Sequence, residues 1–160
     1  MGAGATGGAT GVVLAATDLS ELSLPALEAA SAASKRSGAK LVVVSALELA
    51  DPVSISAASL IGAAPAVPSA EVLGQLHSVL RSTLEQTLTR LGISGEIRVL
   101  EGAAARSIIE CAEELGAELV VVGTHGRTGL LRFALGSVAE RVIRNAKSSV
   151  LCVRAAQPPA

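Results

Sequence analysis

The sequence is nearly devoid of aromatic residues, with one Phe and neither Trp nor Tyr among its 160 residues. Proteins that bind single-stranded nucleic acid stack bases on aromatic side chains. Binding to a phosphate backbone also requires an excess of basic charge. Here 13 Lys and Arg residues are balanced by 14 Asp and Glu residues, for a net charge of -1. The composition therefore argues against nucleic acid as a partner.

Cysteine is scarce as well, and the two that occur are Cys111 and Cys152. Neither has a His or Cys neighbour at the spacing of a metal site. We predict that both are buried thiols of a cytoplasmic protein in a reducing compartment. A chain of this length can bury enough apolar surface to fold without a disulfide or a structural metal.

Long apolar runs are missing too. The stretch that comes nearest to a transmembrane segment, Pro52 to Ala70, contains three Pro and four Ser residues, so we predict a loop there and no membrane association. Residues 1–10 are mostly Gly, Ala and Thr, and residues 155–160 are mostly Ala and Pro. We expect both ends to be flexible tails around a single domain of residues 11–154.

Strand and helix patterns alternate along that domain. Strands are predicted at Val12–Thr17, Leu41–Leu47, Ile97–Val99, Leu119–Val122 and Val150–Val153. Helices are predicted from Asp18 or Ser20 to Ser37, from Glu71 to Gly92, around Ile108 to Leu115, and from Ser137 to Asn145. Each strand-helix-strand crossover is right-handed and returns the chain parallel. The pattern therefore predicts a doubly wound α/β fold with a five-stranded parallel sheet.

Part of this pattern is an internal repeat. The segment Gly38-Ala39-Lys40 precedes a Leu-Val-Val-Val run, and Gly116-Ala117-Glu118 precedes an identical one. In both copies we expect a glycine that ends a helix to lead into a buried strand.

In a doubly wound sheet the ligand lies beyond the carboxyl ends of the strands, where the strand order reverses. Two predicted strand ends carry unusual residues: Thr17-Asp18 after the first strand, and the segment from Gly123 after the fourth. Asp18 is a candidate for contact with a ligand. The alternative is that it only caps the following helix.

The segment from Gly123 combines three features of a phosphate site. Glycines at 123, 126 and 136 let the backbone approach an anion closely. Ser137 and Glu140 have the spacing of a capping box, which predicts a helix beginning directly after Gly136, and a helix start binds phosphate through its free amide groups. The alternative is that the glycines only turn the chain and that Ser137 only caps the helix.

The spacing Gly123-x2-Gly126-x9-Gly136-Ser137 and the Thr17-Asp18 strand end resemble the ATP-binding subgroup of the universal stress protein family. The resemblance covers about residues 11–154. It implies a Rossmann-like sheet of order 3-2-1-4-5 that holds ATP, alone or with Mg²⁺, between the first and fourth strands. It also implies a homodimer, and we expect the two copies to pair through the last strand, Val150 to Val153, at an edge of the sheet.

The resemblance further implies a set of binding residues. Asp18 would bond the ribose, the backbone of Ala46 would meet the adenine edge, and Gly123 would lie along the ribose. The remaining residues of the implied site are Ala16, Thr17, Thr124, His125, Gly126, Arg127, Thr128, Gly136, Ser137 and Val138. The sequence departs from the family at Ser45, where many relatives carry His, and at 103–105, where a Pro is common.

Three functions remain open at this stage. The first is a nucleotide-dependent sensor or regulator in the stress response, the second a dimeric scaffold that binds no nucleotide, and the third a slow ATPase or nucleotidyl-transfer enzyme. Asp18, His125 and Ser137 could suggest a hydrolase triad, but the sequence lacks the Gly-x-Ser-x-Gly nucleophile turn. It also lacks a Walker sequence. We therefore assign no catalytic residues and no protein-held metal.

Overall fold

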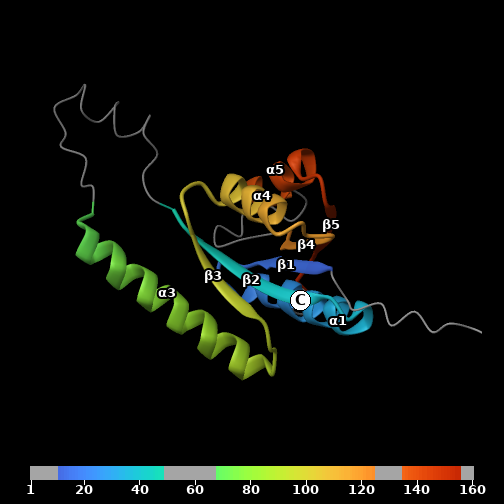
Figure 1. Ribbon diagram of the computed structural model, residues 1–160, viewed down its shortest axis with the longest axis horizontal. Helices are drawn as coiled ribbons and strands as arrows, with labels where there is room; N and C mark the ends of the chain where they lie inside the picture. Colours follow the sequence, from blue (N-terminus) through green and yellow to red (C-terminus); the bar gives the residue numbers. More distant parts are fainter. Residues whose placement is uncertain (1–10, 49–67, 125–134, 156–160) are drawn as a thin grey trace, which may run out of the picture.

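The computed structural model describes residues 11–48, 68–124 and 135–155, which form a five-stranded sheet with helices on both faces (Figure 1). The strands are β1 (Val12–Ala16), β2 (Lys40–Leu47), β3 (Glu96–Glu101), β4 (Leu119–Gly123) and β5 (Ser149–Val153). The helices are the short 3-10 helix η1 (Glu21–Ser23), α1 (Leu24–Ser37), α3 (Ala70–Leu91), α4 (Ala104–Glu114) and α5 (Ser137–Asn145). All strand pairs are parallel, in the order β3-β2-β1-β4-β5. The predicted fold class and strand order are confirmed.

Two helices cover each face of the sheet. Side chains alternate between the faces of a strand, and in β1 this divides the core into two layers. Val13 and Ala15 belong to the cluster with α1 and α3, whereas Leu14 and Ala16 belong to the cluster with α4 and α5. The central strands are buried from both sides, which explains why their sequences are almost continuously apolar.

β1 lies at the point where the strand order reverses. β2 pairs on one side of it and β4 on the other, and both Val44 and Val122 stand level with Ala16. The two copies of the internal repeat are thus the two neighbours of β1. Each enters the sheet through a backbone bond to the start of β1: the Lys40 amide donates to the Gly11 carbonyl, and the Glu118 amide to the Val12 carbonyl (both 2.9 Å).

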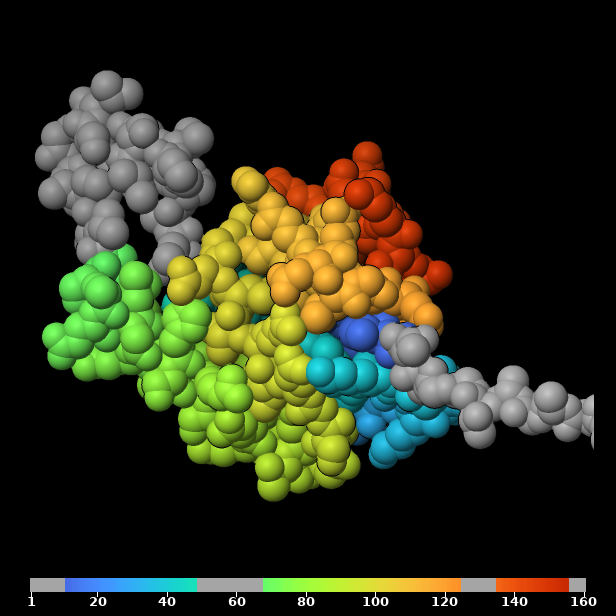
Figure 2. Space-filling model, in the orientation of Figure 1, coloured from blue at the N-terminus to red at the C-terminus, as the bar shows by residue number. Residues whose placement is uncertain are grey.

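Helix α3 is packed over only its second half. Leu84 and Leu88 are buried against the sheet, whereas Leu76 and Val79 are 40% and 64% exposed. Figure 1 shows the helix running beside β3, and in Figure 2 its amino-terminal end forms one edge of the molecule. The first turns of α3 therefore present apolar side chains that the sheet does not cover.

The start of the first helix differs from the prediction. Neither Asp18 nor Ser20 caps it with its side chain, because the 3-10 helix η1 intervenes and α1 begins at Leu24. Pro25 occupies the first turn, where its fixed φ and missing amide proton are tolerated. The predicted helix ends are confirmed at Gly38 and Gly92, whose φ values of 71° and 64° are left-handed.

Of the two cysteines, Cys111 is buried as predicted, but Cys152 is only partly buried because it lies on the edge strand β5. No helix within the described ranges is both long and apolar enough to cross a bilayer. The predicted tail at 1–10 lies outside the described residues, as do residues 156–160 of the tail predicted at 155–160 and residues 52–67 of the predicted loop. The loop was predicted to end at Ala70, but Ala70 is already the first residue of α3.

Candidate functional site

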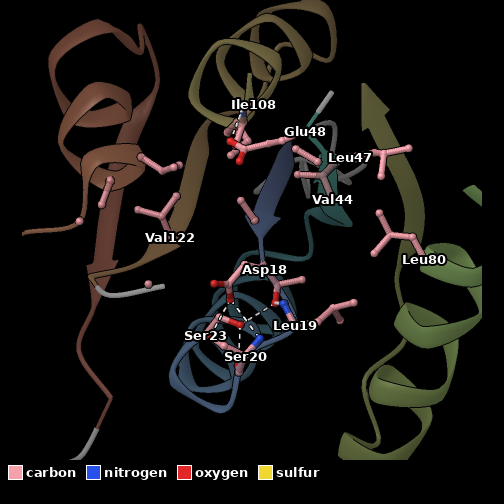
Figure 3. A pocket seen from close by; sticks show the side chains of 18 of the residues that line it. Asp18, Leu19, Ser20, Ser23, Val44, Leu47, Glu48, Leu80, Ile108 and Val122 are labelled. Atoms are coloured by element: carbon pink, nitrogen blue, oxygen red, sulfur yellow. Dashed lines mark hydrogen bonds between the residues drawn. The ribbon is translucent and has the colours of Figure 1, made fainter. Parts of the chain in front are cut away.

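A cleft of about 890 Å³ opens at the carboxyl edge of the sheet, above the reversal of strand order (Figure 3). Its floor comes from the ends of β1, β2 and β4. Its walls come from the starts of α4 and α5 and from the first half of α3. The cleft lies where open parallel sheets bind their ligands, and its size is that of small-molecule sites, about 300–1,000 Å³.

A directional chain of hydrogen bonds fixes the turn after β1. The Leu19 amide donates to Thr17 Oγ1 (3.0 Å), and Ser23 Oγ donates to the Ser20 carbonyl (2.8 Å). Thr17 Oγ1 and Ser23 Oγ lie 2.7 Å apart. Since the Ser23 hydroxyl proton is already donated, Thr17 must be the donor of this bond. The buried Thr17 hydroxyl thus links the strand end to the turn that follows it.

Asp18 projects from this turn at the cleft wall. Its Oδ1 accepts hydrogen bonds from the Ser20 amide (3.0 Å) and from Ser20 Oγ (2.6 Å). This is an Asx turn rather than a cap of α1. Leu19 next to it has a φ of 64°, a left-handed conformation that costs a non-glycine residue about 1–2 kcal/mol. The turn is therefore held in an unusual shape, and such strain is often found at binding sites.

The opposite wall is the beginning of α5. Gly136 is its N-cap residue in extended conformation, and the Gly136 carbonyl accepts from the Glu140 amide (2.9 Å). The predicted capping box is wrong, because Ser137 is already the first helical residue and no side chain caps this helix. An N-cap side chain acts only from the position before the helix, which a glycine occupies here. Among the described residues, no side chain accepts from the first amides of α5, and the residues that carry these amides line the cleft.

The end of the cleft beside β2 is mostly apolar. Leu47 of β2, Leu76 and Leu80 of α3, and Ile108 of α4 line it. Glu48, directly after β2, brings a carboxylate to the same end, and Figure 3 shows it beside Ile108. A mainly apolar surface with a few polar groups is typical of sites that take a flat, largely hydrophobic ligand group.

Eight of the residues proposed from the sequence line the same cleft: Ala16, Thr17, Asp18, Ala46, Gly123, Gly136, Ser137 and Val138. Thr124 lies beside it, where its amide donates to the Val153 carbonyl (2.9 Å) and its carbonyl accepts from the Gly136 amide (2.8 Å). His125, Gly126, Arg127 and Thr128 lie outside the described residues.

Sequence reasoning missed Glu48, the α3 wall and the roles of Ser20 and Ser23. One signal for the α3 wall was present in the sequence. A single stripe of apolar residues is enough to pack a helix on the sheet, and Val72 and Val79 are additional apolar residues outside this stripe. Within the described ranges, no group of three or more His, Cys, Asp or Glu residues could hold a metal ion. This site thus offers main-chain groups, two carboxylates and apolar walls.

An open parallel sheet with helices on both faces and a cleft at its order reversal defines a doubly wound α/β protein. A sequence profile of the universal stress protein family matches residues 10–154. The chain belongs to the universal stress protein family.

Comparison with individual proteins supports the same assignment. Universal stress protein MJ0531 of Methanocaldococcus jannaschii is 52% identical over 63 residues, which cover 39% of this chain and 37% of that protein. The match thus spans less than half of this relative's length. The solved structure of MJ0577, also from M. jannaschii, superposes with a TM-score of 0.71 at 22% identity, over 93% of this chain and 99% of that one. It shows the shared fold.

A universal stress protein solved in complex with cAMP is also similar. Its TM-score is 0.60 at 28% identity, over 90% of this chain and 96% of that one. The fold of this chain is thus shared with a protein that holds an adenine nucleotide.

Proposed function

We propose that this chain binds an adenine nucleotide in the cleft, ATP alone or with Mg²⁺, and acts as a nucleotide-dependent regulator in the stress response. The observation that carries the proposal is the uncapped start of α5, which opens on a cleft of nucleotide size at the switch point of the sheet. The relative that was solved with cAMP supports the ligand class.

The phosphates are assigned to the α5 end of the cleft. The start of a helix carries about half a positive charge, and its free amides are donors for an anion. Gly136 has no side chain to keep a phosphate away, and Gly123, at the end of β4, lines the same cleft. Both features make a close approach between ligand and backbone possible.

The nucleoside is assigned to the other end. Asp18 is an acceptor suited to ribose hydroxyls, which donate hydrogen bonds. The described lining contains no aromatic side chain, so the base packs between aliphatic groups such as Leu80 and Ile108. Ala46, at the end of β2, supplies main-chain groups for the edge of the base.

Charge constrains how a triphosphate binds. Among the described lining residues, Asp18 and Glu48 are acidic and none is basic. Backbone amides must therefore supply much of the attraction within this part of the site. A Mg²⁺ ion bound to the phosphates would lower the repulsion, and it would arrive with the nucleotide because Mg²⁺ prefers phosphate oxygens and water.

The proposed assembly is a cytoplasmic homodimer paired through β5. β5 is an edge strand, and an edge exposes unpaired backbone groups that a second strand can bond. Leu151 on this strand and Ile143 on α5 are both exposed large apolar residues. A symmetric contact would cover them on both copies.

The proposal is tested by isothermal titration calorimetry with ATP, ADP and AMP, each with and without Mg²⁺. The variant Gly136→Asp places a carboxylate at the start of α5 and should weaken ATP by more than about 2 kcal/mol, or about thirtyfold. Gly74→Asp is the matched control, because Gly74 lies on α3 with open space around it, and its affinity should equal that of the wild type.

Two results would contradict the proposal. One is a wild-type protein that binds none of the three nucleotides and releases none after heat denaturation. The other is a Gly136→Asp variant that binds ATP as tightly as Gly74→Asp does. Because the chain has neither Trp nor Tyr, released nucleotide would dominate the absorbance near 280 nm.

A further inference from the structure

Glu48 is one of two charged side chains in the described lining of the cleft, and the only one at its apolar end. We propose that Glu48 is a specificity-determining residue: its carboxylate accepts a hydrogen bond from the exocyclic amino group of adenine. It thereby selects adenine over purines that lack this amine. The inference rests on the proposed nucleotide function and names the group that reads the base.

The backbone around Glu48 holds it in place. The Gly102 amide donates to the carbonyl of Leu47 (3.0 Å), which ties the end of β2 to the turn before α4. Glu48 Oε1 then accepts from the Ala104 amide at the start of α4 (3.3 Å). The first bond fixes the backbone next to Glu48, and the second, longer bond turns its exposed carboxylate toward the α4 side of the cleft, where Figure 3 shows it.

The bond to Ala104 leaves the carboxylate able to accept more. Charge-assisted hydrogen bonds are commonly about 2.7–2.9 Å long, and this one is 3.3 Å, so it is weak. An ionised carboxylate has about four acceptor sites. Glu48 can therefore hold its orientation on α4 while it accepts a donor from a ligand.

The polarity of the cleft decides which ligand group meets Glu48. Phosphates are repelled by a carboxylate and are drawn to the uncapped start of α5, so the base is the part that lies between Leu47, Leu80 and Ile108. A carboxylate accepts hydrogen bonds but cannot donate them. Adenine presents an amine at its 6-position, whereas a purine with hydrogen there has nothing to donate.

A simpler role for Glu48 is to cap α4, whose N-cap residue Ala103 has no side-chain acceptor. That role alone would affect stability and would weaken all nucleotides alike. The proposed role instead changes the ratio between the affinity for a nucleotide that carries the 6-amino group and the affinity for one that lacks it. The ratio therefore separates base selection from capping.

The test is calorimetry with ATP and with purine riboside 5′-triphosphate, which differs from ATP only by lacking the 6-amino group. The wild type should bind ATP about tenfold more tightly, the value of one charge-assisted hydrogen bond. In Glu48→Gln a neutral oxygen accepts about half as strongly, so the ratio should fall to about threefold. In Glu48→Ala the ratio should approach one.

Glu110→Gln is the matched control, since Glu110 pairs with Arg106 on the exposed face of α4 and should keep the wild-type ratio. Should Glu48→Ala fail to fold, Glu48→Gln retains a capping oxygen and carries the test. Equal affinities in the wild type, or a tenfold ratio that persists in the Glu48 variants, would overturn the inference while nucleotide binding stands. If the wild type binds neither nucleotide, the proposed function and this inference both fall.

Discussion

The uneven packing of α3 predicts that two leucines of one helix differ sharply in their contribution to stability. Leu84 has no exposed surface and belongs to the cluster between the sheet, α1 and α3. Leu76 lies two turns earlier and is 40% exposed at the cleft. Replacing each by Ala keeps helix propensity high, so the comparison isolates packing.

The magnitudes follow from burial. Truncation of a fully buried Leu removes its transfer free energy and leaves a cavity, which together cost about 2–5 kcal/mol. We expect Leu84→Ala to lower the free energy of unfolding by about 3 kcal/mol and Tm by about 6–12 °C. Leu76→Ala opens no closed cavity, because its surroundings already communicate with solvent, and should cost less than about 1 kcal/mol.

Urea unfolding followed by far-ultraviolet circular dichroism measures both values, since a chain without Trp or Tyr offers no useful intrinsic fluorescence. The slope m should be the same in both variants and the wild type, because the surface exposed on unfolding hardly changes. Equal losses in the two variants would refute the assignment of the sheet contact to the second half of α3. So would a loss below about 1 kcal/mol for Leu84→Ala.

Two further predictions concern titratable groups. Hydrogen bonds from Lys40 and, to a smaller extent, Arg98 lower the pKa of Glu96 from 4.5 to about 2. The contribution of Glu96 to stability is therefore complete above pH 4.5 and is lost as the pH falls toward 2. Glu96→Gln should make the free energy of unfolding less dependent on pH in this window, and an unchanged pH profile would contradict the pairing. Burial raises the pKa of both thiols, and Cys111 is the more buried. Iodoacetamide should therefore label Cys152 before Cys111 in the native monomer, as followed by mass spectrometry, and prior labelling of Cys111 would refute this order.

The fold was predictable because its signals are local. Each buried strand is a Val-rich run, and the glycines Gly38 and Gly92 end their helices in left-handed conformation, as the sequence predicts. The turn after β1 was not predictable in the same way. Asp18 suits a helix cap and an Asx turn equally well, and the choice depends on the buried bond between Thr17 and Ser23, which forms only in the folded chain.

The site was predictable only where its residues follow strands directly. Thr17, Asp18 and Gly123 end adjacent strands, so a parallel sheet brings them to one edge. The Glu48 side chain is oriented by a hydrogen bond from the Ala104 amide, which lies 56 positions away in the sequence. No local sequence pattern reveals that contact. The cap of α5 was misassigned by one residue, because the capping-box pattern does not show that Gly136 takes the extended conformation.

The internal repeat sets the span of the cleft. Its two copies are the neighbours of β1, so the residues that follow them stand one strand to either side of Asp18. Neighbouring strands lie about 4.8 Å apart, which separates the two ends by about 10 Å. Backbone hydrogen bonds fix this distance. Substitutions of side chains can therefore change which groups a ligand contacts, but they hardly change the length of the ligand that fits the cleft.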